Sequence, residues 1–87
     1  MDPFFAPSID HKIYEIDLHE TGSISEALDF LDSQLFFLIG KEQYCKVIYG
    51  IGEGILRKEV LAHLKKLSYI KSVQEDSQNA GACLVLM

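Results

Sequence analysis

Apolar and polar residues alternate over residues 12–19, and this period of two predicts a β-strand with one buried face. A strand covered on both faces would be apolar throughout, so we expect solvent on the polar side. The apolar face consists of Tyr14, Ile16 and Leu18, and the polar face of Glu15, Asp17 and His19.

Two longer segments, residues 26–39 and 55–67, repeat their apolar residues at helical spacing. Ser23 or Ser25 can cap the first helix, and Gly40 ends it. The apolar positions are Ala27, Leu28, Leu31, Leu35, Phe36, Leu38 and Ile39 in the first helix, and Leu56, Val60, Leu61, Leu64 and Leu67 in the second.

Three further strands are expected over residues 44–49, 70–76 and 82–87, with a turn at 77–81. The turn makes a hairpin, so the last strand runs antiparallel to the third. Right-handed crossovers place both helices on one side of the sheet. The pattern therefore predicts an α/β fold of order β-α-β-α-β-β, a two-layer sandwich with a mixed four-stranded sheet and both helices on one face.

A chain of 87 residues is long enough for one small domain. Residues 1–11 lack periodicity and contain two prolines, so we expect an extended arm before a domain at 12–87. No apolar run approaches the roughly 20 residues of a membrane span, and the acidic N-terminus lacks the basic region of a signal peptide. We therefore expect a cytoplasmic protein without membrane association, either a monomer or part of a longer chain.

The net charge and the spacing of cysteines and histidines limit which ligands, metals and catalytic groups the domain can use. The net charge is −5, and an acidic domain is a poor general binder of nucleic acid, so any phosphate site must be local. Cys45 and Cys83 stand in apolar stretches without metal-ligand spacing, and we predict two buried, unpaired thiols. His63 is expected to be a surface or partly buried residue, and no catalytic triad follows from the spacing.

Asp17 and His19 stand two residues apart at the C-terminal end of the first strand, which places both side chains on one face. Ligands of open α/β sheets usually bind at this edge. A carboxylate beside an imidazole raises its pKa and fixes its tautomer, which suits acid–base catalysis. The alternative is two ordinary polar residues on a solvated face.

Alternating glycines, Gly50, Gly52 and Gly54, form a loop before the second helix. Glycines allow close backbone approach to a ligand, and a helix N-terminus favours an anion. Arg57 in the first turn adds a candidate phosphate contact. The spacing fits neither a P-loop nor a dinucleotide fingerprint, and a tight turn without a ligand is the alternative.

Taken together, the segments Ile16-Asp17-Leu18-His19 and Tyr49-Gly50-Ile51-Gly52-Glu53-Gly54-Ile55-Leu56-Arg57 resemble the motifs of the small MutS-related (Smr) domain. The resemblance runs from about Lys12 to Met87. It implies a two-layer sandwich similar to the C-terminal domain of translation initiation factor 3.

The resemblance also implies a nucleic-acid-processing domain acting on DNA or RNA, in repair or RNA processing. Asp17 and His19 then fall on the Leu-Asp-x-His motif as catalytic candidates, while Gly50, Gly52 and Gly54 fall on the glycine motif and Arg57 on the basic residue after it. Together with Tyr49, which stands at the first position of the glycine motif, they are the phosphate-binding candidates. The family motif usually begins with His or Thr in place of Tyr49. Tyrosine can stack on a base or donate one hydrogen bond, but its pKa near 10 makes it a poor base.

Three hypotheses of function remain open at this point. The first is a DNA-nicking or RNA-cleaving endonuclease, the second a nucleic-acid-binding module without catalysis. The third is a protein-interaction domain that uses Phe4 and Phe5 of the arm. A divalent ion at Asp17 is conceivable as a cofactor, but no second carboxylate is fixed beside it, so no metal ligands are predicted.

Overall fold

The computed structural model describes residues 13–52 and 54–87, and the arm predicted at residues 1–11 lies outside them. The elements follow in the expected order. They are β1 (Tyr14–Asp17), α2 (Ile24–Leu38), β2 (Tyr44–Ile48), α3 (Ile55–Lys66), β3 (Ser72–Glu75) and β4 (Ala82–Leu86). Each strand is shorter than its hydrophobic pattern, because a strand ends where its neighbour stops pairing with it.

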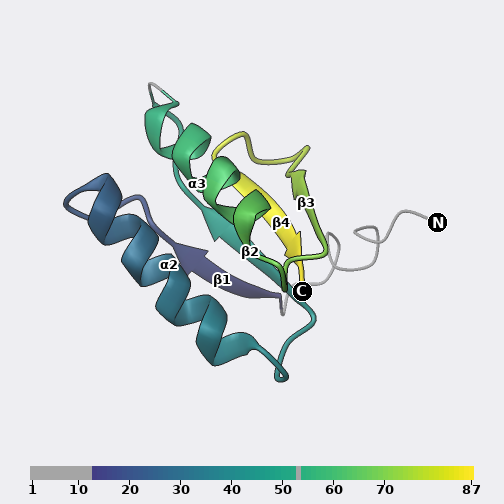
Figure 1. Cartoon of the computed structure of the whole chain (residues 1–87). Coiled ribbons are helices and arrows are strands. Elements are labelled where there is room, and N and C mark those ends of the chain that lie inside the picture. Colours follow the sequence, from purple (N-terminus) through teal and green to yellow (C-terminus); the bar gives the residue numbers. More distant parts are fainter. Residues whose placement is uncertain (1–12, 53) are drawn as a thin grey trace.

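The four strands form one mixed sheet in the order β1-β2-β4-β3 (Figure 1). β1 pairs with β2 in parallel, and β4 runs antiparallel to both β2 and β3. The predicted hairpin is therefore confirmed, and its second strand inserts between β2 and β3. In this central position four of the five residues of β4 are buried. The insertion places the start of β4 next to the end of β2.

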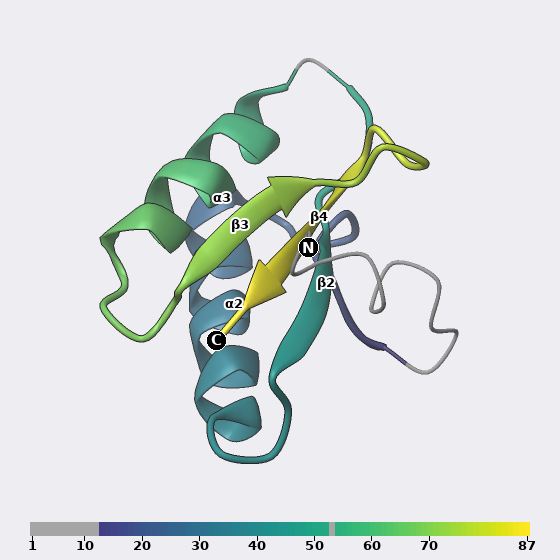
Figure 2. The same ribbon diagram turned by 90° about the vertical axis from the view of Figure 1, so that its right-hand side faces the viewer.

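Both helices cover one face of the sheet, which confirms the two-layer sandwich (Figure 2). The buried core lies between the layers and takes residues from the strands and both helices. Its largest fully buried side chains are Ile16, Leu18, Leu31, Leu35, Leu38 and Leu64. Cys45 and Cys83 are buried and unpaired as predicted, and burial raises the pKa of each thiol to about 12.

α2 begins where Ser23 caps it, since the Ser23 hydroxyl accepts a hydrogen bond from the Glu26 amide at 3.1 Å. The helix carries more apolar residues than its buried face can hold. Phe36 and Ile39, which helical spacing assigns to the core, are 79% and 44% exposed. Residues 35–39 are apolar without interruption, so they encircle the helix and only part of them can face the sheet. No helix in the described part of the chain is long and apolar enough to cross a membrane.

The division of α2 into buried and exposed apolar side chains predicts that two truncations will lower the free energy of unfolding by different amounts. Leu31 is fully buried, so Leu31→Ala should lower the free energy of unfolding by about 2–5 kcal/mol. Phe36→Ala removes a larger side chain but should change it by less than about 0.5 kcal/mol, because that side chain is mostly solvated. Equilibrium unfolding in urea measures both values, and similar losses would contradict the assignment of the core face.

Candidate functional site

The C-terminal ends of β1 and β2 meet at one edge of the sheet (Figure 1). Asp17 lies opposite Ile48 in the parallel register, and the Leu18 amide donates to the Ile48 carbonyl at 2.7 Å. A Cβ atom added to Gly50 would lie 3.3 Å from that of His19. The Asp17–His19 pair and the Tyr49–Gly50 strand end therefore lie side by side.

Asp17 holds His19 through two contacts. One carboxylate oxygen, Oδ1, accepts a hydrogen bond from the His19 backbone amide at 3.1 Å and pairs with the ring nitrogen Nδ1. A carboxylate only accepts, so Nδ1 carries a proton and Nε2 remains for other contacts. Nε2 lies 3.5 Å from the Glu20 carboxylate, and half of the His19 side chain is exposed.

The contact between Asp17 and His19 changes the pKa of both side chains. The hydrogen bond and charge of Asp17 raise the pKa of His19 above its ordinary value of 6.5. The hydrogen bond from His19 lowers the pKa of the Asp17 carboxyl. Near neutral pH the imidazole thus holds a proton more readily than a free histidine does, so it can attract an anion or act as a general acid.

The glycine loop is anchored to the first residues of the β4 region. The carbonyl oxygen of Gly81 accepts hydrogen bonds from the amides of Tyr49 and Gly50, both at 2.9 Å. A Cβ atom on Gly81 would lie 2.9 Å from the Gly50 carbonyl carbon, so glycine is required for this approach. The hairpin turn thereby holds the beginning of the loop beside His19.

The loop ends at the N-terminus of α3. Gly54 is the N-cap in the left-handed conformation, with φ of 82°, and no side chain in the described part of the chain caps this end. The first amides of a helix have no partners within it, and together with the helix dipole they favour an anion. Glycine at the cap has no side chain of its own to bind those amides.

Tyr49 lies beneath this helix end. Its side chain is 4% exposed, and its buried hydroxyl lies beside the Arg57 guanidinium without a well-formed hydrogen bond to it. Burial raises the pKa of Tyr49 to about 12 against a smaller opposing effect of the nearby Arg57 guanidinium. The hydroxyl is therefore protonated at neutral pH. It can donate a hydrogen bond but does not act as a base.

Arg57, the predicted phosphate contact, is paired with Glu75 of β3. The Arg57 Nε atom donates to Glu75 Oε1 at 2.6 Å, and Nη2 contacts the same oxygen. Both side chains are about half exposed. Nothing in the sequence indicates this partner, which stands 18 residues away. A guanidinium has five N–H groups, so Arg57 retains donors for a second anion.

A hollow of about 260 Å³ lies over these groups, lined by residues 49–52 and 54–57. Two larger hollows, of about 540 and 590 Å³, lie at the other end of α2, where Ile39 and Lys41 line both. Neither contains any of the predicted site residues. The two larger hollows therefore lie away from the edge where the Asp17–His19 pair and the glycine loop meet.

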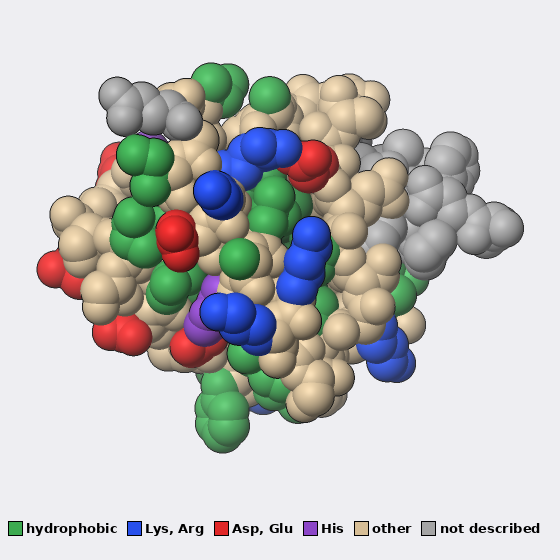
Figure 3. All heavy atoms as spheres, turned by 45° about the horizontal axis from the view of Figure 1, so that its top comes forward, with side chains coloured by type: hydrophobic (Ala, Val, Ile, Leu, Met, Phe, Trp, Pro, Cys, Tyr) green, Lys and Arg blue, Asp and Glu red, His purple; other side chains and the backbone are tan. Residues whose placement is uncertain are grey.

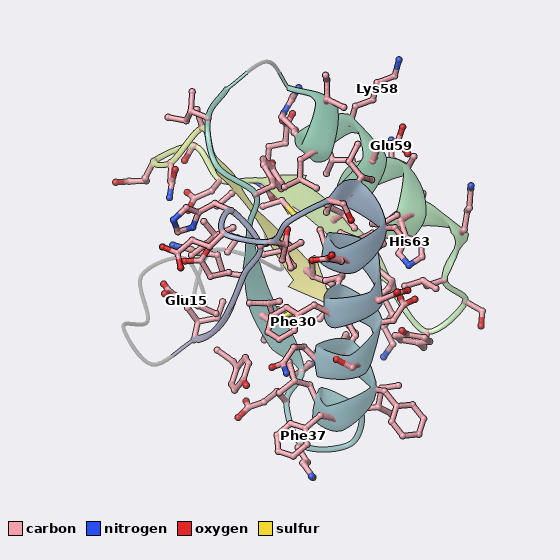
Figure 4. All side chains as sticks on the ribbon, turned by 90° about the vertical axis from the view of Figure 1, so that its left-hand side faces the viewer. Glu15, Phe30, Phe37, Lys58, Glu59 and His63 are labelled. Carbon is pink, nitrogen blue, oxygen red and sulfur yellow. The ribbon has the colours of Figure 1, made fainter. Side chains whose placement is uncertain are left out.

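Two other groups complete the account of the predicted residues. His63 of α3 pairs with Asp32 of α2 at 2.7 Å, and it lies on the side of α3 that faces α2 (Figure 4). It is partly buried, as predicted, and away from the glycine loop. No three His, Cys, Asp or Glu side chains gather as a metal site within residues 13–52 and 54–87.

The contact between Asp17 and His19 predicts a change in the pKa of His19 when the carboxylate is removed. Asp17→Asn removes the carboxylate charge, so the pKa of His19 should fall towards 6.5. NMR titration of the imidazole protons measures it. Glu15→Gln, on the same polar face of β1, is the matched control and should leave the His19 midpoint in place. An unchanged midpoint in Asp17→Asn would contradict the pairing.

The anchoring of the loop predicts different effects at two glycines. Gly81→Ala should lower the free energy of unfolding by about 1–3 kcal/mol, because the added methyl collides with the Gly50 backbone. Gly52→Ala should change it by less than about 1 kcal/mol, since open space surrounds that position and its φ is not positive. Thermal or urea unfolding of the two variants checks this order.

Comparison with known proteins agrees with this geometry. The chain is similar to the crystal structure of the Smr domain of Thermus thermophilus MutS2, with a TM-score of 0.79 and 22% sequence identity. The match covers 85% of this chain and 96% of that one. No curated protein matches the chain. The family model of the Smr domain matches residues 16–87, which include the Asp17–His19 pair and the glycine loop, and the chain therefore belongs to the Smr domain family.

Proposed function

We propose that this Smr domain binds nucleic acid and holds a backbone phosphate at the N-terminus of α3. The observation that carries the proposal is the convergence of three groups suited to an anion. No described side chain caps the α3 end, Arg57 in its first turn keeps N–H donors beyond those that contact Glu75, and His19 favours its protonated form. Amides at a helix N-terminus bind phosphate in many folds.

Each group has a separate part in this proposal. The amides of the α3 first turn and the glycine loop surround the phosphate oxygens, and Tyr49, whose hydroxyl is buried, packs next to them beside Arg57. His19 adds positive charge from the β1 side, where a Cβ on Gly50 would approach it at 3.3 Å. Arg57 contributes its remaining N–H groups, and Glu75 fixes the orientation of its guanidinium.

The charge distribution supports a local site on an acidic domain. Basic side chains gather over α3 with a few acidic ones among them, and further acidic side chains lie towards α2 (Figure 3). Arg57 and Lys58 stand at the glycine-loop end of α3, and Lys65 and Lys66 lie in its last turn. Lys58 extends away from the helix into solvent (Figure 4). This helix can therefore attract a polyanion that the net charge of −5 would otherwise repel.

The dimensions of the hollow favour a chain over a free small molecule. Sites that enclose a whole small ligand measure roughly 300–1,000 Å³. The hollow at the glycine loop, about 260 Å³, is smaller. It suits one phosphate with part of its neighbouring nucleotide, while the rest of the strand continues over the surface.

Phosphodiester cleavage is the second candidate function, and the Asp17–His19 pair favours it. A water molecule, or the 2′-hydroxyl of RNA, would attack the phosphorus and release its proton to solvent, while His19 donates its proton to the leaving oxygen and Asp17 fixes the ring. The pKa of about 12 prevents Tyr49 from acting as the base that a histidine at this position would provide. Binding requires none of this proton transfer, and it is therefore the function that the geometry supports best.

Two substitutions that change the charge at the proposed phosphate site in opposite directions test its binding of nucleic acid. Arg57→Ala should weaken affinity for both DNA and RNA oligonucleotides and reduce the salt dependence by about one unit of slope. Glu75→Gln removes the carboxylate beside the guanidinium and should strengthen affinity. Fluorescence anisotropy at several salt concentrations measures both, with Lys41→Ala, at the far end of α2, as the control. Equal affinities for all variants would contradict the proposed phosphate site.

A second experiment separates cleavage from binding. If the domain cleaves, His19→Ala should slow it by about 10²–10⁴-fold, while affinity falls only modestly. Tyr49→His should raise cleavage. Gel assays with single-stranded and branched DNA and RNA, with divalent ions present, measure the rates. If wild type and Tyr49→His leave every substrate intact but bind it, the binding module is correct and the nuclease hypothesis is wrong.

A further inference from the structure

The glycine loop and the first residue of α3 carry two exposed aliphatic side chains next to the proposed phosphate site. Ile51 is 81% exposed and Ile55 is 54% exposed, and both line the hollow at the start of α3. Isolated apolar residues on a surface are ordinary. These two differ because they flank a group of anion-binding donors, where a polar or basic side chain would serve a phosphate better.

The backbone holds Ile51 outward. Gly50 has a positive φ of 83°, and its amide is fixed to the Gly81 carbonyl at 2.9 Å. On the other side Gly52 has open space around it. A side chain so exposed, between two glycines, contributes little to the core. Its apolar surface is available to a ligand.

A ligand that contacts both the anion-binding amides and the exposed isoleucines must carry an anionic group next to an apolar surface. A nucleotide has both, since the phosphate is linked through the sugar to a base with flat apolar faces. In a continuous duplex those faces are stacked on neighbouring pairs and unavailable to Ile51. An unpaired or unstacked base exposes them, and aliphatic side chains such as isoleucine pack against bases or wedge between base steps.

We propose, building on the phosphate site above, that Ile51 and Ile55 form an apolar contact for an unpaired base next to the bound phosphate. The domain then prefers single-stranded nucleic acid, or a duplex with an unpaired nucleotide, over a continuous duplex. The α3 end and Arg57 provide affinity for any phosphate backbone. Ile51 and Ile55 provide the preference for nucleic acid with an unpaired base.

The test compares three probes that share one strand containing 2-aminopurine, a fluorescent analogue of adenine. The strand is used alone, in a continuous duplex and in a duplex where the analogue is unpaired. Ile51→Ser combined with Ile55→Ser should weaken binding of the single strand and the unpaired probe by about 5–10-fold. Affinity for the continuous duplex should stay within about twofold. Both side chains are exposed, so the thermal unfolding midpoint should not change.

Two matched variants sharpen the comparison. Ile51→Leu keeps the apolar surface and should retain the preference. Phe36→Ser removes an exposed aromatic residue on α2, away from the loop, and should alter no affinity. DNA and RNA versions of each probe distinguish the two backbones.

Each outcome decides a different claim. A loss confined to the probes with an unpaired base supports the apolar contact. An equal loss on all three probes, or no loss, overturns it while leaving the phosphate site intact. A wild-type domain that binds none of the probes overturns the proposed function and this contact together.

Discussion

The close contact between the backbones of Gly50 and Gly81 sets the position of the glycine loop. The Gly81 carbonyl accepts the amides of Tyr49 and Gly50, and no side chain can separate the two segments. This contact exists because β4 inserts between β2 and β3. The sheet order therefore brings the loop, His19 and the N-terminus of α3 to one edge.

The site combines fixed and exposed parts. Asp17 fixes His19, and Glu75 fixes Arg57, so two cationic groups have defined orientations before any ligand arrives. Ile51 is exposed at the surface, and no described side chain caps the first amides of α3. Such preorganised polar groups lower the cost of binding, since fewer side chains must be ordered by the ligand.

Local patterns in the sequence predict the elements and much of the site. The alternation at residues 12–19 and the glycines at 50–54 place Asp17, His19 and the loop where the structure has them. The Arg57–Glu75 pair and the Gly50–Gly81 contact could not be predicted, because each joins residues whose proximity depends on where β3 and β4 enter the sheet. Phe36 was assigned wrongly to the core, since an unbroken apolar run does not identify its buried face.

The central claim, that a nucleic-acid phosphate lies at the α3 N-terminus, is tested most directly by mapping amide chemical shifts. The ¹⁵N-labelled full chain is titrated with a short single-stranded oligonucleotide. The account predicts the largest changes at the amides of residues 50–57 and at the His19 ring. Changes concentrated around Ile39 and Lys41, where the larger hollows lie, with residues 50–57 unaffected, would contradict it.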